Sequence, residues 1–270
     1  MSKKAFQRSS AIDNESKRSF IPARAEALAY DDWYATARGA ALFQSEKEAV
    51  EQLLRRLPKP WVEIGVGTGR FAQALGISIG LDPSFEALKI AERRRIIAVA
   101  GSGEDLPLAS ERVGAVLMAM TLCFLANPVA ALNEVQRALQ EGGGIVLGFM
   151  PRETPWADLY QRKGKEGHPT YSHAQFFTIR EVELLLDQAG LAAVDQRCTL
   201  TLPPSSDIFG AEAVSENIGD SAGFVAILAK NCSRNSLSCE TRNGSPDANH
   251  LGRRYSFAFR FTSSRKSSIS

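Results

Sequence analysis

Short apolar stretches alternate with amphipathic stretches along most of this chain, and this alternation restricts the fold more than any other feature. Seven apolar stretches have the length and composition of buried strands: residues 61–65, 78–82, 96–100, 113–119, 144–149, 192–200 and 223–230. Two of the intervening helical stretches, 45–57 and 127–144, carry start signals. Ser45 with Glu48 predicts a capping box, while Asn127 predicts an N-cap and the terminal glycines predict a helix end. Strands that alternate with helices predict an α/β fold, a parallel sheet with helices on both faces.

Composition separates one folded region from the two ends of the chain. A length of 270 residues, 44% of them apolar, suits a single domain, which we place at residues 26–230. Residues 1–25 are mostly polar, and they predict a flexible N-terminal segment. Residues 231–270 contain ten serines and seven Lys or Arg against two acids. This composition predicts a Ser-rich, basic, disordered tail.

Charge, apolar runs and cysteine spacing exclude several classes of protein. The formal net charge is +2, and the positive charge gathers in the tail, so the folded region is not expected to bind nucleic acid. No apolar run reaches the roughly 20 residues of a membrane span, and the first residues lack the apolar run of a signal peptide. Four cysteines and three histidines without paired spacing predict neither a metal site nor a disulfide framework. We therefore expect a cytoplasmic protein without a membrane partner.

A turn with three alternate glycines follows the first predicted strand. In "VEIGVGTGRFAQAL", Gly65, Gly67 and Gly69 form a GxGxG pattern. A dinucleotide-binding turn would need glycine where Arg70 stands, and no GK[ST] follows as in a P-loop. Glu63 also places an uncompensated carboxylate where a phosphate would bind. S-Adenosylmethionine carries an ammonium, a sulfonium and no phosphate, so the charge pattern favours this cofactor.

A second acid stands at the end of the second predicted strand. Asp82, in "GLDPS", lies 17 residues after Gly65 and directly before Pro83. Ligands of open α/β sheets bind at the carboxyl ends of the strands, where a carboxylate can accept from both hydroxyls of a ribose. The alternative is an ordinary strand-end or N-cap aspartate. Because Glu63 stands at the first predicted strand as a second acid of the same site, we favour the ribose contact for Asp82 over the capping role.

Four segments between about residues 30 and 200 resemble the class I S-adenosylmethionine-dependent methyltransferases, in particular the small-molecule, methyltransferase type 11-like members. They read "EIGVGTGRFAQAL", "GLDPS", "GSGEDLPL" and "TLCFLANP", in the same order as in the family. The resemblance implies a Rossmann-like sheet of seven strands in the order 3-2-1-4-5-7-6, with the last strand antiparallel and helices on both faces. It also implies an enzyme that methylates a small-molecule acceptor.

The resemblance also assigns cofactor contacts by position. The residues expected to bind S-adenosylmethionine are Glu63, Gly65, Gly67, Thr68, Gly69, Asp82, Gly103, Glu104 and Thr121. Glu63 should face the ammonium group and Asp82 the ribose. Ser102 replaces the aspartate that binds adenine in many relatives. The adenine contact is therefore expected from Glu104 or from the backbone of Gly103.

The acceptor side should be formed by segments outside the common core. These are the aromatic stretch 30–43 and an insertion at 150–177, whose aromatic side chains either line a pocket or only pack on the core. Within the insertion, "RKGKEGHP" at 162–169 is not expected to hold a rigid element, which predicts a substrate-side lid. Tyr171 and His173 are weak candidates for a catalytic base, and a structural role is the alternative for each.

Methyl transfer from a sulfonium depends mainly on positioning, so no particular catalytic residue is expected. Thr121, just past the fourth predicted strand, should face the methyl-transfer side, and Cys123 is expected to be a buried structural thiol. "MTLCF" stands where nucleic-acid amine methyltransferases carry [ND]PP[YFW]. A small-molecule methyltransferase is therefore the leading hypothesis. The alternatives are an RNA or protein methyltransferase that uses the basic tail, and a non-catalytic interaction protein.

Overall fold

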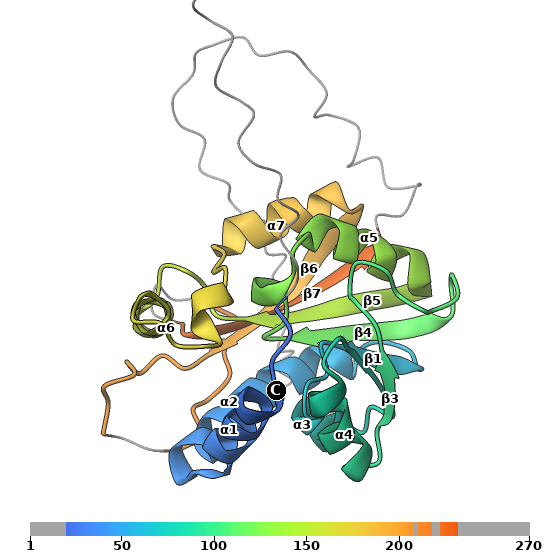
Figure 1. Cartoon of the computed structure of the whole chain (residues 1–270). Helices are drawn as coiled ribbons and strands as arrows, with labels where there is room; N and C mark the ends of the chain where they lie inside the picture. The colour runs from blue at the N-terminus through green and yellow to red at the C-terminus, as the bar shows by residue number, and fades with distance from the viewer. Residues whose placement is uncertain (1–19, 208–209, 218–221, 232–270) are drawn as a thin grey trace, which may run out of the picture. The chain divides into compact units, whose positions relative to one another are not determined.

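The computed structural model describes residues 20–231, except 208–209 and 218–221, and contains one sheet of seven strands (Figure 1). The strands are β1 (Trp61–Ile64), β2 (Ile79–Asp82), β3 (Ile97–Ala100), β4 (Val113–Ala119), β5 (Leu139–Phe149), β6 (Leu191–Thr199) and β7 (Phe224–Asn231). Their order is β3-β2-β1-β4-β5-β7-β6. All neighbouring strands among the first five, β1 to β5, pair in parallel, whereas β7 runs antiparallel to both β5 and β6. The predicted fold class is therefore confirmed.

Helices cover both faces of this sheet (Figure 1). They are α1 (Arg24–Ala35), α2 (Ala37–Leu54), α3 (Arg70–Leu75), α4 (Phe85–Arg93), α5 (Pro128–Ala138), α6 (Pro155–Lys165) and α7 (Ile179–Gln188), with short 3-10 turns η1 (Leu122–Phe124) and η2 (Tyr171–His173). The helices α1–α4 lie on one side, and α5 and α7 lie on the other. No helix in the described ranges is long and apolar enough to cross a membrane.

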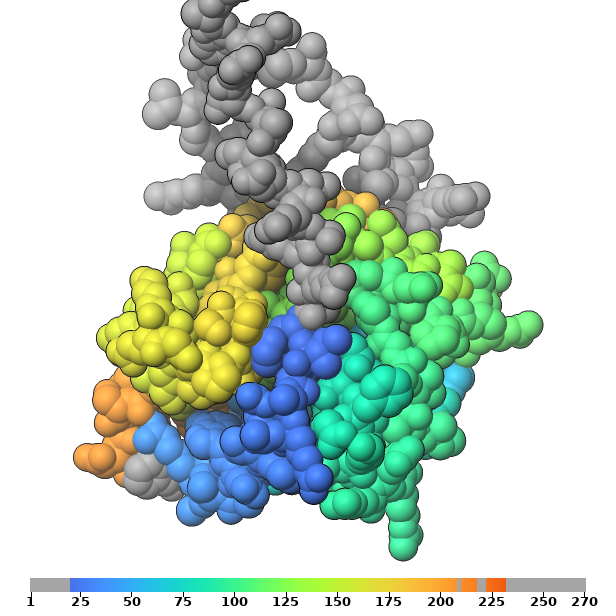
Figure 2. Space-filling model, viewed as in Figure 1, coloured from blue at the N-terminus to red at the C-terminus, as the bar shows by residue number. Residues whose placement is uncertain are grey.

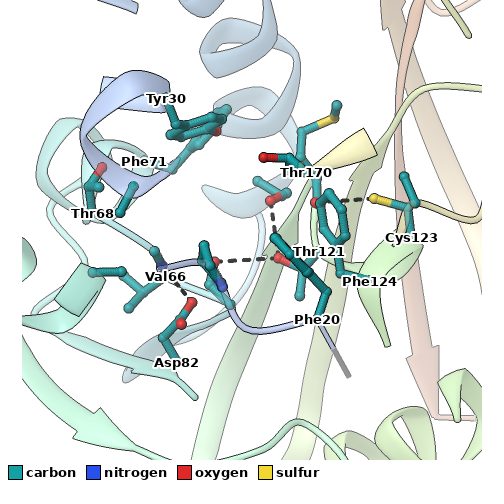
Figure 3. A pocket seen from close by; sticks show the side chains of 18 of the residues that line it. Phe20, Tyr30, Val66, Thr68, Phe71, Asp82, Thr121, Cys123, Phe124 and Thr170 are labelled. Carbon is teal, nitrogen blue, oxygen red and sulfur yellow. Dashed lines mark hydrogen bonds between the residues drawn. The ribbon is translucent and has the colours of Figure 1, made fainter. Parts of the chain in front are cut away.

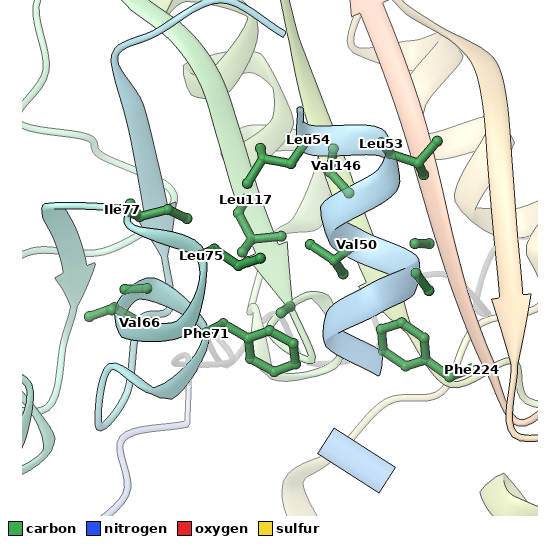
Figure 4. Packing of buried hydrophobic residues seen from close by; sticks show 14 of the residues in the cluster. Val50, Leu53, Leu54, Val66, Phe71, Leu75, Ile77, Leu117, Val146 and Phe224 are labelled. Carbon is green, nitrogen blue, oxygen red and sulfur yellow. The ribbon is translucent and has the colours of Figure 1, made fainter. Parts of the chain in front are cut away.

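Each face of the sheet has its own apolar core. Leu117 of β4 packs in the cluster under α2 and α3, together with Phe71 and Val50 (Figure 4). The next residue along the strand, Met118, points into the cluster under α5 and α7. Both side chains are 0% exposed. Burial on both faces explains why β4 is an unbroken apolar run, as is usual for an inner strand of a parallel sheet.

The glycine run after α5 belongs to a strand. The sequence predicted a helix over 127–144, but α5 ends at Ala138 and β5 begins at Leu139. The pairing of β5 with β4 shifts register between Val113 and Ala115, which leaves the intervening β5 residues in a bulge. Gly142 in this bulge has a φ of +73°, a conformation that other residues rarely adopt. The prediction of a helix end at these glycines was wrong because they serve the bulge.

The predicted capping box at Ser45 was also wrong. Helix α2 begins eight residues earlier, at Ala37, and its N-cap is Thr36, whose side chain accepts from the Gly39 N–H at 3.0 Å. Ser45 is therefore in the middle of α2, where its hydroxyl donates to the Ala41 carbonyl at 3.1 Å. The helical spacing of apolar residues continues upstream of Ser45. A helix that starts at Ala37 gives the backbone N–H groups around Ser45 intrahelical hydrogen-bond partners, whereas a helix starting at Ser45 would leave these groups without them.

Candidate active site

The glycine turn joins β1 to α3 in a conformation that depends on glycine. Gly65, Gly67 and Gly69 have φ values of +72°, +50° and +83°. A Cβ on Gly65 would lie 2.3 Å from the side chain of Thr121, so the two segments touch. A Cβ on Gly67 would meet nothing within 4 Å, because this residue borders open space. The three glycines thus serve different purposes, and only Gly67 faces open space.

Asp82 holds the turn in place from the end of β2. One carboxylate oxygen accepts from the Gly67 N–H at 2.9 Å, and the other accepts from the Ser84 N–H at 2.8 Å. The side chain is buried, and this burial raises its pKa although both N–H groups lower it. Each oxygen keeps a second lone pair, so the carboxylate can still accept from a ligand.

Glu63 is a buried carboxyl group with an unsatisfied oxygen. It is 2% exposed, and its Oε2 has no hydrogen-bond partner. Burial raises its pKa well above the usual range, the Asp82 charge adds to this, and a hydrogen bond from the Ala72 backbone opposes it. A buried acceptor without a partner is costly, and a bound cation would supply the missing partner.

One cavity of about 200 Å³ runs past these groups (Figure 3). Among the residues predicted from the sequence, those on its wall are Glu63, Gly65, Gly67, Thr68, Asp82, Gly103, Glu104, Thr121 and Tyr171. Gly69 and His173 are not on this wall. Gly69 is the N-cap of α3, and a Cβ there would press on Ala91 of α4 at 3.1 Å, so its role is in packing.

The predicted adenine side is formed by the loop after β3. Oε1 of Glu104 accepts from the backbone N–H groups of Ala126 and Asn127 at 3.0 and 3.3 Å, and Oε2 bonds the Ser102 hydroxyl. This carboxylate therefore ties the β3 loop to the segment before α5. Gly103 lies beside it and leaves the cavity wall without a side chain at that point.

A carboxylate that the sequence did not single out ties α1 to the glycine turn. Asp31 accepts from Thr68 Oγ1 at 3.0 Å and from Arg70 Nε at 2.7 Å, and its other oxygen accepts from Arg94 at 2.8 Å. Burial would raise the pKa of Asp31, but these hydrogen bonds outweigh it and lower the pKa. These partners stand 37 to 63 residues away from Asp31 in the chain, so no local sequence pattern could have predicted its role.

The chain before α1 runs along the edge of the cavity. Phe20 stacks on His173 with ring centres 4.9 Å apart, and its N–H donates to the Phe124 carbonyl at 3.2 Å. Farther on, Ser84 Oγ donates to the carbonyl of Pro22 at 2.8 Å. Figure 2 shows this N-terminal segment, in blue, between the yellow surface of α6 and η2 and the teal surface of α3 and α4. His173 thus supports the edge of the cavity.

An aromatic chamber forms the other end of the cavity, and its residues come from α1, α2, α6 and the segment around η2. Its rings are Trp33, Tyr34, Trp156, Tyr160, Tyr171 and Phe176. Burial raises the pKa of Tyr160 to about 12 and raises that of Tyr171 further. A phenol with a raised pKa is a poor base at neutral pH. The aromatic residues of the 30–43 and 150–177 stretches therefore do line a cavity, while Tyr171 remains protonated in it.

Glu46 of α2 is a second buried carboxyl that the sequence analysis did not single out. It lines the chamber at 4% exposure, and its Oε2 accepts from the Tyr34 hydroxyl at 3.0 Å. Burial raises the pKa of Glu46 to about 7, although the Tyr34 hydrogen bond lowers it. A signal did exist, because Leu42, Glu46 and Val50 share one helix face by their spacing of four residues.

The insertion has more regular structure than its composition predicted. Helix α6 continues through Lys165, so the expectation that 162–169 cannot hold a rigid element was wrong for its first half. Gly164 allows this packing, because a Cβ there would lie 2.5 Å from the carbonyl oxygen of Tyr171 in η2. Helix α6 and η2 therefore pack closely against each other.

The structure describes two of the four cysteines, Cys123 and Cys198. Cys123 is half-buried on the cavity wall, and burial raises the pKa of its thiol to about 12, while Cys198 is buried. The structure describes no group of three His, Cys, Asp or Glu side chains that could hold a metal ion. The other two cysteines, Cys232 and Cys239, and the predicted tail beyond Asn231 lie outside the described residues.

Known proteins share this sequence over most of its length. Residues 62–147 match a methyltransferase domain. The chain is 46% identical over 204 residues to an uncharacterized protein of Mycobacterium tuberculosis, which covers 76% of this chain and 72% of that protein. It is 36% identical over 202 residues to an uncharacterized protein of Methanocaldococcus jannaschii, which covers 74% of this chain and 94% of that protein.

Solved structures agree with these relationships. A Thermotoga maritima protein, described as a SAM-dependent methyltransferase and possible histamine N-methyltransferase, superposes with a TM-score of 0.70 at 35% identity, covering 77% of this chain and 97% of that chain. The CcbJ methyltransferase of Streptomyces caelestis superposes with a TM-score of 0.55 at 17% identity, covering 77% and 96%, and shares the fold. Together with the strand order and the glycine turn, these similarities show that the chain belongs to the class I S-adenosylmethionine-dependent methyltransferases.

Proposed function

We propose that this enzyme methylates a small molecule that is enclosed with the cofactor in a single cavity. The observation that carries the proposal is the continuity of that cavity, which extends from Gly67 and Asp82 to the aromatic chamber around Trp156. Helix α1 and the segment before it border the cavity on one side, as Tyr34 and Phe20 are both on its wall. A concave chamber lined by aromatic rings suits a small acceptor better than a macromolecule.

The turn and its two acids fit S-adenosylmethionine. Glu63, with its unsatisfied Oε2, would accept from the ammonium group, and Asp82 would accept from the ribose hydroxyls. Gly67 would let the backbone approach the methionine moiety, because nothing fills the space beside it. The cofactor, when bound, supplies an electrophilic methyl group on its sulfonium.

The remaining roles follow from position on the cavity wall. Thr68 and Gly65 would contact the methionine moiety, Gly103 and Glu104 would border the adenine, and Thr121, which touches Gly65, would face the methyl-transfer side. The chain would accelerate the reaction by holding the acceptor in line with the methyl group and by excluding water from the chamber.

The test compares acceptor classes directly. The full chain is incubated with labelled S-adenosylmethionine and, separately, with metabolite-sized compounds, with RNA and with protein. We expect the label in small molecules only, and we expect Asp82→Ala to abolish it. Label that enters only RNA or protein would refute the small-molecule acceptor and would favour a role for the basic tail.

A further inference from the structure

The charges on the cavity wall are unbalanced. Five carboxyl side chains line the cavity, whereas Arg70 is the one cation that lines it among the described residues: the acids are Glu26, Glu46, Glu63, Asp82 and Glu104. Arg70 is already paired with Asp31 at 2.7 Å. S-Adenosylmethionine carries a net positive charge and compensates only part of this excess. A second ligand in the cavity is therefore favoured if it is a cation and repelled if it is an anion.

Glu46 is the carboxylate that the second ligand would meet. Glu63 and Asp82 stand at the ends of β1 and β2, beside the glycine turn, whereas Glu46 comes from α2 and faces the tyrosines of the chamber. Its Oε2 is bonded to Tyr34, and its Oε1 has no hydrogen-bond partner among the described residues. A carboxylate held at 4% exposure, with one oxygen fixed and one available, can receive a donor from the ligand.

We propose that the methyl acceptor is a small amine on an aromatic or apolar body, and that Glu46 binds its ammonium group and takes up the proton it must lose. This proposal rests on the proposed function, since it assumes that the chamber holds a small acceptor. The rings of Trp33, Tyr34 and Trp156 on the same wall supply an apolar surface for the body of the ligand. Their faces also attract a cation.

The proton balance gives Glu46 a chemical role. An ammonium nitrogen has no lone pair, so one proton passes from it to the Glu46 carboxylate before transfer. The nitrogen–methyl bond then forms as the sulfur–methyl bond breaks, and the electron pair of the broken bond stays on sulfur. The proton on Glu46 returns to solvent when the product leaves. The pKa of about 7 that burial gives this carboxyl suits proton exchange near neutral pH.

Among Glu46 and the described ionisable groups that surround it, only the Glu46 carboxyl has a pKa near neutral pH. Tyr30 and Tyr34 of α1 and Tyr160 of α6 face it, and burial raises the pKa of all three phenols. Arg70 lies over the Tyr34 ring, 5.7 Å from its centre, and stays paired with Asp31. A pH dependence near 7 that involves the amine site is therefore attributed to Glu46.

Matched ligands test the charge of the acceptor. The full chain, saturated with S-adenosylhomocysteine, is titrated calorimetrically with phenethylamine, tyramine and histamine, and with the carboxylates of the same skeletons, 3-phenylpropanoate, 3-(4-hydroxyphenyl)propanoate and 3-(imidazol-4-yl)propanoate. We expect at least one amine to bind at least tenfold more tightly than its matched carboxylate. If no amine outcompetes its carboxylate, the proposal is wrong.

Variants test the role of Glu46. Glu46→Gln keeps the shape and the Tyr34 hydrogen bond, so we expect it to abolish the preference for the amine and to lower kcat/KM for the best amine about a hundredfold. The affinity for S-adenosylhomocysteine should stay within twofold, which shows that the variant is folded. Glu48→Gln, on the same helix and off the cavity wall, serves as the matched control and should behave like the parent.

The outcomes separate this proposal from the proposed function. A parent-like preference for amines in Glu46→Gln would overturn the role of Glu46. Tight binding and methylation of a neutral or anionic small molecule would overturn the amine acceptor but would leave a small-molecule methyltransferase. Transfer to RNA or protein, with no small ligand bound, would overturn both.

Discussion

The two ends of the cavity are built in different ways. At the proposed cofactor end, the wall is formed by the backbone of one turn and by two acids of neighbouring strands, and Glu63, Gly67 and Asp82 fall within twenty residues of each other. At the proposed acceptor end, side chains from α1, α2, α6 and η2 converge, and Tyr34 and Tyr171 are far apart in the chain. A contiguous motif can be recognised in a sequence, whereas a chamber assembled from separate helices exists only after folding.

The largest effect is expected at the cofactor end. Asp82→Ala would remove the acceptor that holds the Gly67 N–H and the proposed ribose contact together. Charge-assisted hydrogen bonds contribute about 1.5 to 3 kcal/mol each, so the affinity for S-adenosylhomocysteine should fall at least a hundredfold by calorimetry. Asp187→Ala, on the exposed side of α7, is the control. Parent-like affinity in Asp82→Ala would show that the end of β2 does not bind the cofactor.

The next effect concerns the link between the two ends. Asp31→Asn keeps the size of the side chain but removes the charge that pairs with Arg70 and Arg94. Because Asp31 joins α1 to the glycine turn, we expect affinity for both S-adenosylhomocysteine and the acceptor to fall, each by roughly tenfold. Asp32→Asn, on the next position of α1, is the comparison. Loss of acceptor binding alone would mean that α1 belongs only to the chamber.

The buried acids predict a pH dependence of stability. The pKa of Glu46 rises from 4.5 to about 7 on folding, so the folded protein binds more protons than the unfolded chain between these values. Its contribution is fully present below pH 4.5 and is lost as the pH rises through 7, a change of roughly 3 kcal/mol. Glu63 and Asp82, whose pKa values are also raised, act in the same direction.

Thermal melts of the ligand-free protein test this prediction. The melting temperature should be higher at pH 5.5 than at pH 8, and Glu46→Gln should reduce the difference, since the amide does not titrate. S-Adenosylhomocysteine should also raise the melting temperature, because its ammonium group would supply the hydrogen-bond partner that Glu63 Oε2 lacks. Equal melting temperatures for the parent at both pH values would contradict the burial of charged carboxylates at either end of the cavity.

The smallest effect is expected outside both ends. Truncation after Asn231, the last residue of β7, removes a segment rich in serine and arginine that offers little apolar surface. We expect unchanged affinity for S-adenosylhomocysteine and unchanged kcat/KM for a small acceptor. A fall of several degrees in the melting temperature would show that the removed residues stabilise the domain.

Particular residues show how far sequence reasoning reached. The strand order that the family resemblance implied is confirmed, and Glu63, Gly67 and Asp82, which belong to motifs local in the sequence, lie on the cavity wall. Gly69 belongs to the same motif but packs on α4, because a pattern does not reveal which glycine faces a ligand. His173 has a side chain that can act as a base, yet its ring stacks on Phe20, a partner more than 150 residues away.

The sequence by itself determined the seven strands and the glycine turn that borders the cavity, because hydrophobic periodicity and glycine spacing act over a few neighbouring residues. Tertiary structure decided which charged side chains are buried. Glu46 reads as one of several charged residues on a helix, and only the packing of α1 and α6 against α2 makes it a buried acid with a pKa near 7. Desolvation depends on every element around a group, so this buried acid became visible only in the folded chain.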